Sequence, residues 1–392
     1  MKIGLVCPYS ITRGGGVQEV VKALQLEYVK LGHEAIIITP QPKDPYRGSN
    51  HVIFLGSAAD FKSPLATTTQ VSASVMTDEI DAMLEQENFD ILHFHEPWVP
   101  VLSRQILSRS RSVNIATVHA KLPETIASRA LAKVVIPYTK PLLKYIHSFT
   151  AVSDAAAEYL QSLTDEPIEI IPNGIHVGHF RRPARLADVE SKVKTILYIG
   201  RLEKRKGVKY LMQAYKVLEE KTDNVRLVIA GDGVDREKLE DYADELGLER
   251  VEFMGYIEDH QKMELLHTAD LFCSPALYGE SFGIVLLESM ASNLVTVAGN
   301  NPGYESVMTG LGQLSLIDPR DTKEFALRME LLLNNVGVRE LWKKWAKKHV
   351  KQFEYYKVAG RYLDAYERAI AGKEAAVQYN EKREQGEGWL RT

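Results

Sequence analysis

The sequence predicts an α/β protein made of two doubly wound domains that follow one another along the chain. Short runs of apolar and β-branched residues alternate with longer stretches in which apolar residues recur at helical spacing. Such alternation favours right-handed strand–helix–strand crossovers and a mainly parallel sheet. The alternation starts again after Pro172-Asn173-Gly174, and 392 residues exceed what one hydrophobic core usually supports.

Each half of the chain has its own set of expected strands. In the first half they cover residues 3–6, 35–39, 52–55, 91–94, 115–119, 149–152 and 168–171. In the second half they cover residues 195–199, 226–230, 251–254, 271–274, 295–298 and 313–316. A helix over residues 17–31 should follow the first strand, because its apolar residues repeat at helical spacing and Gly32 can end it.

The last part of the chain is expected to be helical over residues 322–335, 339–349 and 355–371. Residues 373–392 are polar and charged, so we expect a frayed tail there. The elements as a whole predict an N-terminal domain over residues 1–175 and a C-terminal domain over residues 176–354.

Composition narrows the class of protein. Hydrophobic residues make up 45% of the chain and charged residues 26%, which excludes disordered and fibrous classes. The net charge of −4 gives the whole chain no attraction for nucleic acid. Cys7 and Cys273 lie in separate strand-like segments, which is typical of small core residues in a reducing compartment. We find no signal peptide and no apolar run near the roughly 20 residues of a spanning helix, so we expect a cytoplasmic or peripheral membrane protein.

The loop after the first strand is a candidate ligand site, because ligands of open parallel sheets bind beyond the carboxyl ends of strands. It ends in Gly14-Gly15-Gly16 at a helix start, where backbone amides can approach a phosphate, although the triplet also suits a tight turn. It does not match the GxGxxG fingerprint, and Thr39-Pro40-Gln41 after the second strand provides no acidic residue. A nicotinamide-dependent dehydrogenase is therefore disfavoured.

Basic residues follow the first expected strand of the second domain. Gly200 is followed by Arg201, Lys204, Arg205 and Lys206. Cations ahead of a helix can bind a polyphosphate, Arg through two parallel hydrogen bonds and Lys as a point charge. A solvated basic turn is the alternative interpretation at this point.

A second phosphate site is predicted where the strand over residues 271–274 leads into a helix. We expect the helix to begin near Ser281, whose hydroxyl can cap it. The amides of Phe282, Gly283 and Ile284 would then face an anion at the positive end of the helix dipole.

Two carboxylates accompany this predicted anion site. Glu280 precedes the helix and can accept hydrogen bonds from sugar hydroxyls, and Glu288, about two turns further on, can reach a second set such as those of a ribose. A carboxylate beside a phosphate is unfavourable unless it binds hydroxyl groups. A capped amphipathic helix with two surface glutamates is the alternative.

These residues resemble the retaining GT-B glycosyltransferases of family 4, which use nucleotide-sugar donors. The spacing Glu280-x7-Glu288, the pair Arg201 and Lys206, the glycine-rich first loop and Pro172-Asn173-Gly174 occur in family order, and the resemblance extends to about residue 371. Within the family, residues 4–10, 15–18, 89–97 and 279–288 are most similar to the phosphatidylinositol α-mannosyltransferases.

The resemblance implies two Rossmann-like domains that face a central cleft, with the helix over about 355–371 crossing back onto the N-terminal domain. It implies that His119 and Glu280 are catalytic, and that Tyr9 and Gln18 contact the acceptor. The residues that the resemblance assigns to the donor are Gly16, Arg201, Lys206, Ile257, Ser281, Phe282, Gly283, Ile284 and Glu288.

The resemblance also implies transfer with retention of the α configuration, in which the departing phosphate deprotonates the acceptor. The chain has no Asp-x-Asp motif, so we expect protein cations to take the place of a divalent ion, and no cofactor. His93 and His95 share one face of a strand. Together with His119 they leave a metal site open as an alternative to structural histidines.

The resemblance implies an α-mannosyltransferase that uses GDP-mannose, or another nucleotide-diphosphate sugar, to glycosylate a phosphatidylinositol-type lipid at the cytoplasmic face of the membrane. Trp98 and Ala120 depart from the inositol-phosphate pattern, so another lipid or a glycan acceptor stays open. The rival hypotheses are a UDP-sugar transferase acting on a polysaccharide or soluble acceptor, and a sugar-nucleotide-binding protein without turnover.

The segment over residues 104–144 is basic. From residue 99 to residue 150 there are eight basic residues and one acidic residue, Glu124, a local excess of seven positive charges. Attraction to anionic lipid contributes on the order of 1 kcal/mol per basic residue near a membrane surface. The segment therefore predicts either docking on an anionic membrane or a solvated basic face.

Overall fold

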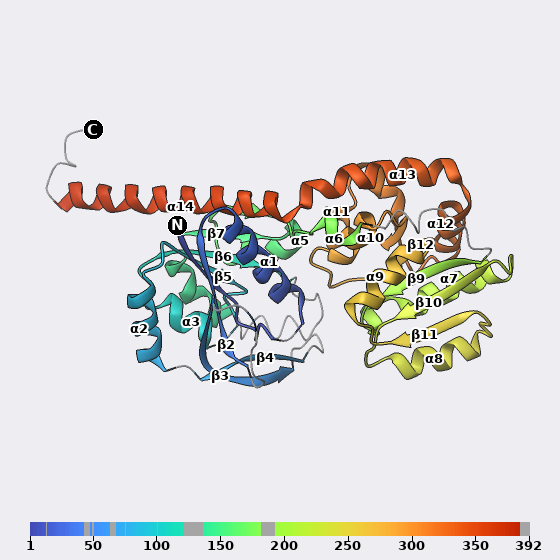
Figure 1. Ribbon diagram of the computed structural model, residues 1–392, viewed down its shortest axis with the longest axis horizontal. Helices are drawn as coiled ribbons and strands as arrows, with labels where there is room; N and C mark the ends of the chain where they lie inside the picture. Colours follow the sequence, from blue (N-terminus) through green and yellow to red (C-terminus); the bar gives the residue numbers. More distant parts are fainter. Residues whose placement is uncertain are drawn as a thin grey trace. The chain divides into compact units, whose positions relative to one another are not determined.

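The computed structural model describes residues 1–12, 14–42, 48, 51–62, 68–74, 76–99, 101–120, 136–181 and 193–384. The chain divides into two compact units, each with its own sheet (Figure 1). The N-terminal unit contains Met1–Val152, Ala156–Pro172 and Tyr355–Thr392. The C-terminal unit contains Ser153–Ala155 and Asn173–Glu354.

The sheet of the N-terminal unit has the strand order β4-β3-β2-β1-β5-β6-β7-β8. All neighbours pair in parallel except β3 and β4, which are antiparallel. Its strands are β1 Lys2–Val6, β2 Glu34–Gln41, β3 Val52–Lys62, β4 Thr68–Ser74, β5 Ile91–His95, β6 Val113–Val118, β7 Ser148–Ala151 and β8 Ile168–Ile170. The chain order reverses between β1 and β5, and the carboxyl ends of these two strands are therefore the place where a ligand is expected.

The expected strands of this half are present, but two features differ from the prediction. The strand β3 continues to Lys62, well beyond residue 55, and β4 was not expected at all. The segment Thr68–Ser74 is rich in Thr, Ser and Gln and has no apolar run, so its local sequence carries little strand signal. It forms a strand by pairing with β3.

The helices that cover this sheet come from the first 172 residues and from α14 near the end of the chain. They are α1 Gly16–Lys30, α2 Thr77–Glu87, α3 Leu102–Leu107, η1 Lys140–Tyr145, α5 Asp154–Gln161 and α14 Tyr355–Glu384. The long helix α14 lies along α1 and β6 (Figure 1). Tyr362 and Tyr366 of α14 enter the same hydrophobic core as Ile3, Leu5 and Tyr28.

The frayed tail predicted from residue 373 is wrong as far as Glu384, because α14 continues to that residue. Residues 373–384 are polar, but they include strong helix formers and no proline. Lys373 also anchors the helix, since its ammonium donates hydrogen bonds to the backbone oxygens of Arg111 and Ser112. Polarity alone predicted fraying, but this polar segment forms a helix as far as Glu384.

The sheet of the C-terminal unit has the strand order β11-β10-β9-β12-β13-β14 and is parallel throughout. Its strands are β9 Lys194–Ile199, β10 Val225–Ala230, β11 Val251–Gly255, β12 Leu271–Ser274, β13 Thr296–Gly299 and β14 Leu316–Ile317. The chain order reverses between β9 and β12. The carboxyl ends of β9 and β12 are thus the corresponding ligand position in this unit.

The helical elements of the C-terminal unit are α6 Val177–Phe180, η3 Lys204–Lys206, α7 Val208–Glu219, α8 Arg236–Glu245, α9 Asp259–Thr268, α10 Ile284–Ala291, α11 Pro302–Val307, η4 Gly310–Ser315, α12 Thr322–Asn334, α13 Val336–His349 and η5 Val350–Phe353. Of these, α12 and α13 correspond to the helices expected over 322–335 and 339–349, although α13 begins three residues earlier. One strand prediction is wrong, because the first residues of the expected strand over 313–316 belong to the 3-10 helix η4. Within the described residues, no helix combines the length and apolar character needed to cross a bilayer.

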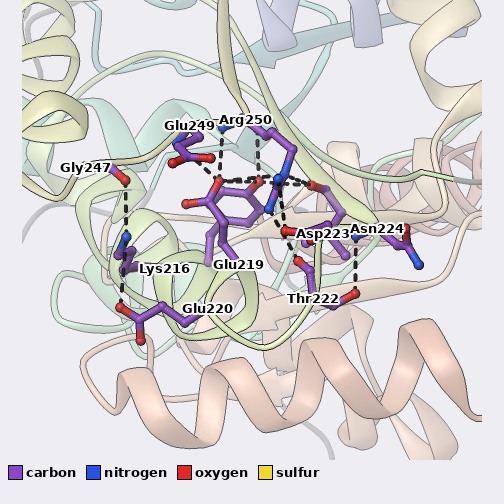
Figure 2. Close-up of polar contacts among 11 residues, drawn as sticks. Lys216, Glu219, Glu220, Thr222, Asp223, Asn224, Gly247, Glu249 and Arg250 are labelled. Atoms are coloured by element: carbon purple, nitrogen blue, oxygen red, sulfur yellow. Dashed lines mark hydrogen bonds and ion pairs between the residues drawn. The ribbon is translucent and has the colours of Figure 1, made fainter.

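A polar cluster stabilises the edge of this sheet at the amino ends of β10 and β11 (Figure 2). Glu219, at the end of α7, is only 8% exposed, and its Oε1 accepts hydrogen bonds from the backbone N–H groups of Glu249 and Arg250 at 3.2 and 3.0 Å. The Arg250 guanidinium donates to the backbone oxygens of Thr222 and Val225. This cluster joins α7 to two strands at the edge opposite the expected ligand position.

Candidate functional site

Two loops of the C-terminal unit meet through a chain of alternating charges. After β9, Glu203 Oε1 lies 2.6 Å from Arg201 Nη1 and its Oε2 lies 2.9 Å from Arg205 Nε. Glu280, in the loop after β12, has its Oε1 2.6 Å from Arg205 Nη1 and 2.8 Å from Lys206 Nζ. The structure thus brings together three of the predicted residues, Arg201, Lys206 and Glu280.

The Arg205 guanidinium is the centre of this charge cluster, which consists of Arg201, Glu203, Arg205, Lys206 and Glu280. The sequence pattern included Arg205 among the cations of the loop but gave it no separate role. Burial of Arg205 acts to lower its pKa, but Glu280 and Glu203 outweigh that effect and raise the pKa. Only 13% of the Arg205 side chain and 12% of the Glu280 side chain are exposed, so neither charge is fully screened by solvent.

The charge cluster retains one positive charge in excess, because three cations face two carboxylates. Such a surplus favours an anionic ligand at the carboxyl edge of β9. Arg205 and Lys206 also hold the carboxylate of Glu280 in place, where it can accept hydrogen bonds from hydroxyl groups.

Glycines allow the loops after β9, β10 and β12 to pack backbone against backbone. Gly207 has a positive φ of 71°, and a Cβ there would lie 2.0 Å from the backbone oxygen of Pro275. Gly231 has a φ of 137°, and a Cβ there would lie 1.9 Å from the backbone oxygen of Gly200. Both positions require glycine for conformation and for space.

The helix after β12 begins later than expected. The helix α10 starts at Ile284, and its N-cap is Gly283 with a φ of 106°. The prediction that Ser281 caps the helix is therefore wrong, and Phe282 precedes the helix rather than opening it. Phe282 is only 4% exposed, and its ring packs edge-on against Phe353 at 5.8 Å.

The physical reason for this start is the space around Gly283. A Cβ at this position would lie 2.7 Å from the ring of Tyr304, in a left-handed conformation that L side chains rarely adopt. The chain therefore turns sharply at Gly283, and the first amides of the helix are those of Ile284 and Val285. An anion at this helix start would meet those amides, and Glu280 of the charge cluster lies four positions before Ile284 in the chain.

Glu288 lies in the second turn of α10 and is paired with a lysine. Lys262 Nζ, from α9, is 3.1 Å from Glu288 Oε1. Burial acts to lower the pKa of Lys262, but Glu288 outweighs it and the pKa is raised. The predicted base-contacting residue Ile257 lies in the turn between β11 and α9 and is partly exposed.

In the N-terminal unit, the strands β5 and β6 bring His95 and His119 into contact. His95 is the last residue of β5, and His119 follows β6 directly. The Nδ1 atom of His95 lies 2.8 Å from the Nε2 atom of His119. His95 is fully buried and His119 is 8% exposed.

Glu96 holds the backbone at this point. Its Oε1 accepts hydrogen bonds from the amides of His119 and Ala120, both at 2.6 Å, and its own backbone has a left-handed φ of 50°. Burial raises the pKa of Glu96 to about 7, although the two amide hydrogen bonds act to lower it. Glu96 belongs to residues 89–97, which carry part of the family resemblance, but the sequence pattern gave it no role. Its position directly after a strand was the available signal.

The predicted acceptor residues lie at the carboxyl end of β1 and in the first turn of α1. Burial raises the pKa of the Tyr9 hydroxyl, and the nearby Glu96 carboxylate raises it further. Gln18 is only 4% exposed, and its side-chain amide lies close against the backbone of Gly15. Gly16 opens the helix α1 at an exposed position.

His93 is engaged on both ring nitrogens. Its Nδ1 lies 2.7 Å from the hydroxyl of Tyr366, and its Nε2 lies 2.6 Å from Oγ1 of Thr117. Burial lowers the pKa of His93 to about 3, so the ring is neutral at physiological pH. These contacts give His93 a structural role. The described residues contain no group of three or more His, Cys, Asp or Glu side chains that could hold a metal ion.

The basic segment is described only in part. Arg104, Arg109, Arg111, Lys140 and Lys144 lie within the described residues. The segment's other basic residues, Lys121, Arg129 and Lys133, and its acidic residue Glu124 lie outside the described residues.

Comparison with known proteins agrees with the geometry. Residues 14–179 match the family described as Glycosyltransferase Family 4, and residues 186–349 match Glycosyl transferases group 1. The chain is 31% identical to the phosphatidyl-myo-inositol mannosyltransferase of Mycobacterium tuberculosis, over 96% of this chain and 99% of that protein. It is 26% identical to the alpha-monoglucosyldiacylglycerol synthase of Streptococcus pneumoniae, over 79% of this chain and 73% of that protein.

Comparison with solved structures identifies the fold. The structure superposes on the sucrose-phosphate synthase of Thermosynechococcus elongatus with a TM-score of 0.75 and 19% identity, over 95% of this chain and 99% of that one. This likeness shows the fold, two Rossmann-like domains of the GT-B type, and the full-length relative shows the family. The chain therefore belongs to glycosyltransferase family 4, a family of retaining hexosyltransferases that use nucleotide-sugar donors.

Proposed function

We propose that this glycosyltransferase is an α-mannosyltransferase that uses GDP-mannose to glycosylate a phosphatidylinositol-type lipid at the cytoplasmic face of the membrane. The observation that carries the donor part is the charge cluster, whose one surplus positive charge lies next to the start of α10. The relative from M. tuberculosis supports the choice of mannose and of an inositol lipid, because it is named for that reaction.

In this proposal the C-terminal unit binds the donor. Arg201 and Lys206 neutralise the diphosphate, and the backbone amides at the start of α10 contact its oxygens. Glu280 accepts hydrogen bonds from the sugar hydroxyls, and Glu288 does the same for the ribose. Ile257 lines the pocket of the base.

The transfer step follows from the same charges. The bond between the anomeric carbon and the phosphate oxygen breaks, and its electron pair goes to the departing diphosphate. Fixed cations and helix amides stabilise this developing charge more than they stabilise the ground state. The acceptor hydroxyl oxygen then bonds to the anomeric carbon on the same face, and its proton goes to the phosphate oxygen.

The N-terminal unit contributes the acceptor side. Tyr9 and Gln18 contact the acceptor, and His119 orients the donor sugar. The basic segment over 104–144 supports a lipid acceptor, because its exposed residues Arg111, Lys140 and Lys144 can attract an anionic membrane surface.

A second candidate is transfer of glucose from UDP-glucose to a diacylglycerol lipid. The relative from S. pneumoniae favours it, since its name describes a glucosyl lipid product. A thermal-shift assay with GDP-mannose, UDP-glucose, GDP and UDP distinguishes the two candidates. Stabilisation by UDP-glucose but not by GDP-mannose would replace the mannosyl proposal.

The diphosphate role is tested with Lys206→Ala, and Lys204→Ala in the same loop serves as a matched control because Lys204 is exposed. Removing one charge-assisted contact, which contributes about 1.5–3 kcal/mol, should weaken GDP binding about 10- to 100-fold. Guanosine binding should change little. Isothermal titration calorimetry measures both, and an equal loss for guanosine and GDP would contradict the diphosphate role.

A further inference from the structure

His95 occupies a central place in a stack of three histidine rings in the N-terminal unit. The ring centroids of His93 and His95 are 4.1 Å apart, and those of His95 and His119 are 5.1 Å apart with an interplanar angle of 30°. In the proposed function, His119 contacts the donor sugar. His95 is the group that touches its ring from the buried side.

The protonation state of His95 follows from its surroundings. Burial holds the pKa of His95 well below its usual value, and the neighbouring rings of His93 and His119 act in the same direction. The ring is therefore neutral and carries a single N–H. Its Nδ1 faces Nε2 of His119 at 2.8 Å, whereas its own Nε2 is buried and has no hydrogen-bond partner within the described part of the chain.

The position of the single proton can be derived from these contacts. A proton on Nε2 of His95 would leave a buried N–H donor without an acceptor, which is rare in native proteins. A proton on Nδ1 donates a hydrogen bond to Nε2 of His119 and leaves only an acceptor lone pair unsatisfied. The second arrangement is the more favourable, because it leaves no buried donor unpaired.

We propose that His95 is a positioning residue, which donates a hydrogen bond from Nδ1 to Nε2 of His119 and so holds the proton of neutral His119 on Nδ1. This inference rests on the proposed function, which places His119 at the donor sugar. With Nε2 acting as an acceptor, Nδ1 of His119 carries the proton and is a donor, which is the polarity that a hydrogen bond to a hydroxyl oxygen requires. A tautomer with the proton on Nε2 would present an acceptor at Nδ1 instead.

Two further groups hold the pair in place. The ring of His93, on which His95 stacks, is held by the Tyr366 hydroxyl of α14 at 2.7 Å. The backbone of His119 is held by Glu96 at 2.6 Å. The ring of His119 is thus restrained by His95, the last residue of β5, and its backbone by Glu96, the residue that follows, as expected for a group whose orientation matters.

The first measurement needs no substrate. A long-range ¹H–¹⁵N correlation spectrum of ¹⁵N-histidine-labelled protein distinguishes a protonated from an unprotonated ring nitrogen, and the His119→Asn variant assigns the signals of His119. We expect a protonated Nδ1 and an unprotonated Nε2. A proton on Nε2 of His119 in the wild-type protein overturns the proposal.

The second measurement uses matched variants. His95→Phe keeps the volume but removes the donor, and it should give mixed tautomers at His119 and a kcat lower by about 10- to 100-fold, with a donor KM that changes less than about threefold. His95→Asn keeps an amide donor near the position of Nδ1 and should restore most of the rate. His147→Phe, in the same unit at the opposite end of the sheet, should leave the His119 signals and the rate unchanged.

The two proposals can fail separately. If His95→Phe leaves the tautomer and the rate as in His147→Phe, His95 is only a packing residue and this proposal fails while the glycosyltransferase proposal stands. If the tautomer is as expected but mannose is not transferred from GDP-mannose, the proposed donor fails and the link between His95 and His119 stands. Both variants are compared with wild type at a temperature where circular dichroism shows each to be folded.

Discussion

Among single residues, the geometry of the site depends on which oppositely charged side chain each charged side chain contacts. Contacts with Glu203 and Arg205 bring together three residues that the sequence predicts for the site, which are Arg201, Lys206 and Glu280. The spacing of residues could not show that Glu280 pairs with Arg205, because 75 positions separate the two in the chain. Only the packing of the loops after β9 and β12 decides that pairing.

Glu96 supports a prediction about pH at this scale. Its pKa is raised from 4.5 to about 7, so the folded protein holds a proton there that the unfolded chain has lost. That protonated form contributes stability below about pH 4.5, and the contribution is lost as pH rises through 7. Relative to Glu96→Gln, which does not titrate, the free energy of unfolding of the wild type should fall by about 3 kcal/mol over this range.

Urea unfolding of wild type and Glu96→Gln at a series of pH values measures this difference. Glu85→Gln, on the exposed face of α2 in the same unit, serves as the control and should show no such trend. A wild-type minus Glu96→Gln difference that stays constant from pH 4.5 to 7.5 would contradict the assignment of a protonated Glu96.

At the scale of elements, the helix α14 is part of the N-terminal core rather than an appendage. The hydroxyl of Tyr366 lies 2.9 Å from that of Tyr28 on α1 and 2.7 Å from Nδ1 of His93 on β5. Helical periodicity in the sequence predicted where α14 begins. It could not predict that Tyr366 satisfies polar groups on two other elements, because those contacts join residues 338 and 273 positions apart.

The substitution Tyr366→Phe tests this role of α14. It removes the hydroxyl and leaves His93 and Tyr28 each short of a buried hydrogen-bond partner, which should lower the free energy of unfolding by about 1–3 kcal/mol. Tyr356→Phe on the same helix is the control, because Tyr356 is 56% exposed. Urea denaturation followed by circular dichroism gives both values, and equal stabilities of the two variants would refute the buried network.

At the scale of the whole molecule, the net charge of −4 conceals a local basic segment. Arg111, Lys140 and Lys144 are exposed members of that segment. Attraction to anionic lipid acts over about 8 Å at physiological salt, so the distribution of charge matters more than its sum.

Reversing these three charges should weaken binding to vesicles that contain phosphatidylinositol. With Arg111, Lys140 and Lys144 changed to Glu, a loss of at least about 3 kcal/mol is expected, which corresponds to more than about a hundredfold in affinity. The control changes Lys344, Lys347 and Lys348 on α13 to Glu, which alters net charge equally in the C-terminal unit. Vesicle flotation measures both, and equal binding of the two triple variants would exclude a docking role for the segment.

The amino-acid sequence was enough to predict the α/β class, the family, most of the residues that the proposed site uses, and the strands of both sheets apart from β4, the bounds of β14 and the far end of β3. These features are local, since each depends on residue types at short spacing. Only the tertiary structure shows that β4 pairs with β3 and that α10 begins directly after the turn at Gly283. It also shows that Arg205 lies at the centre of the charge cluster and that His95 contacts His119. Each of these depends on contacts between distant segments, and no local pattern encodes which distant group fills the space beside a side chain.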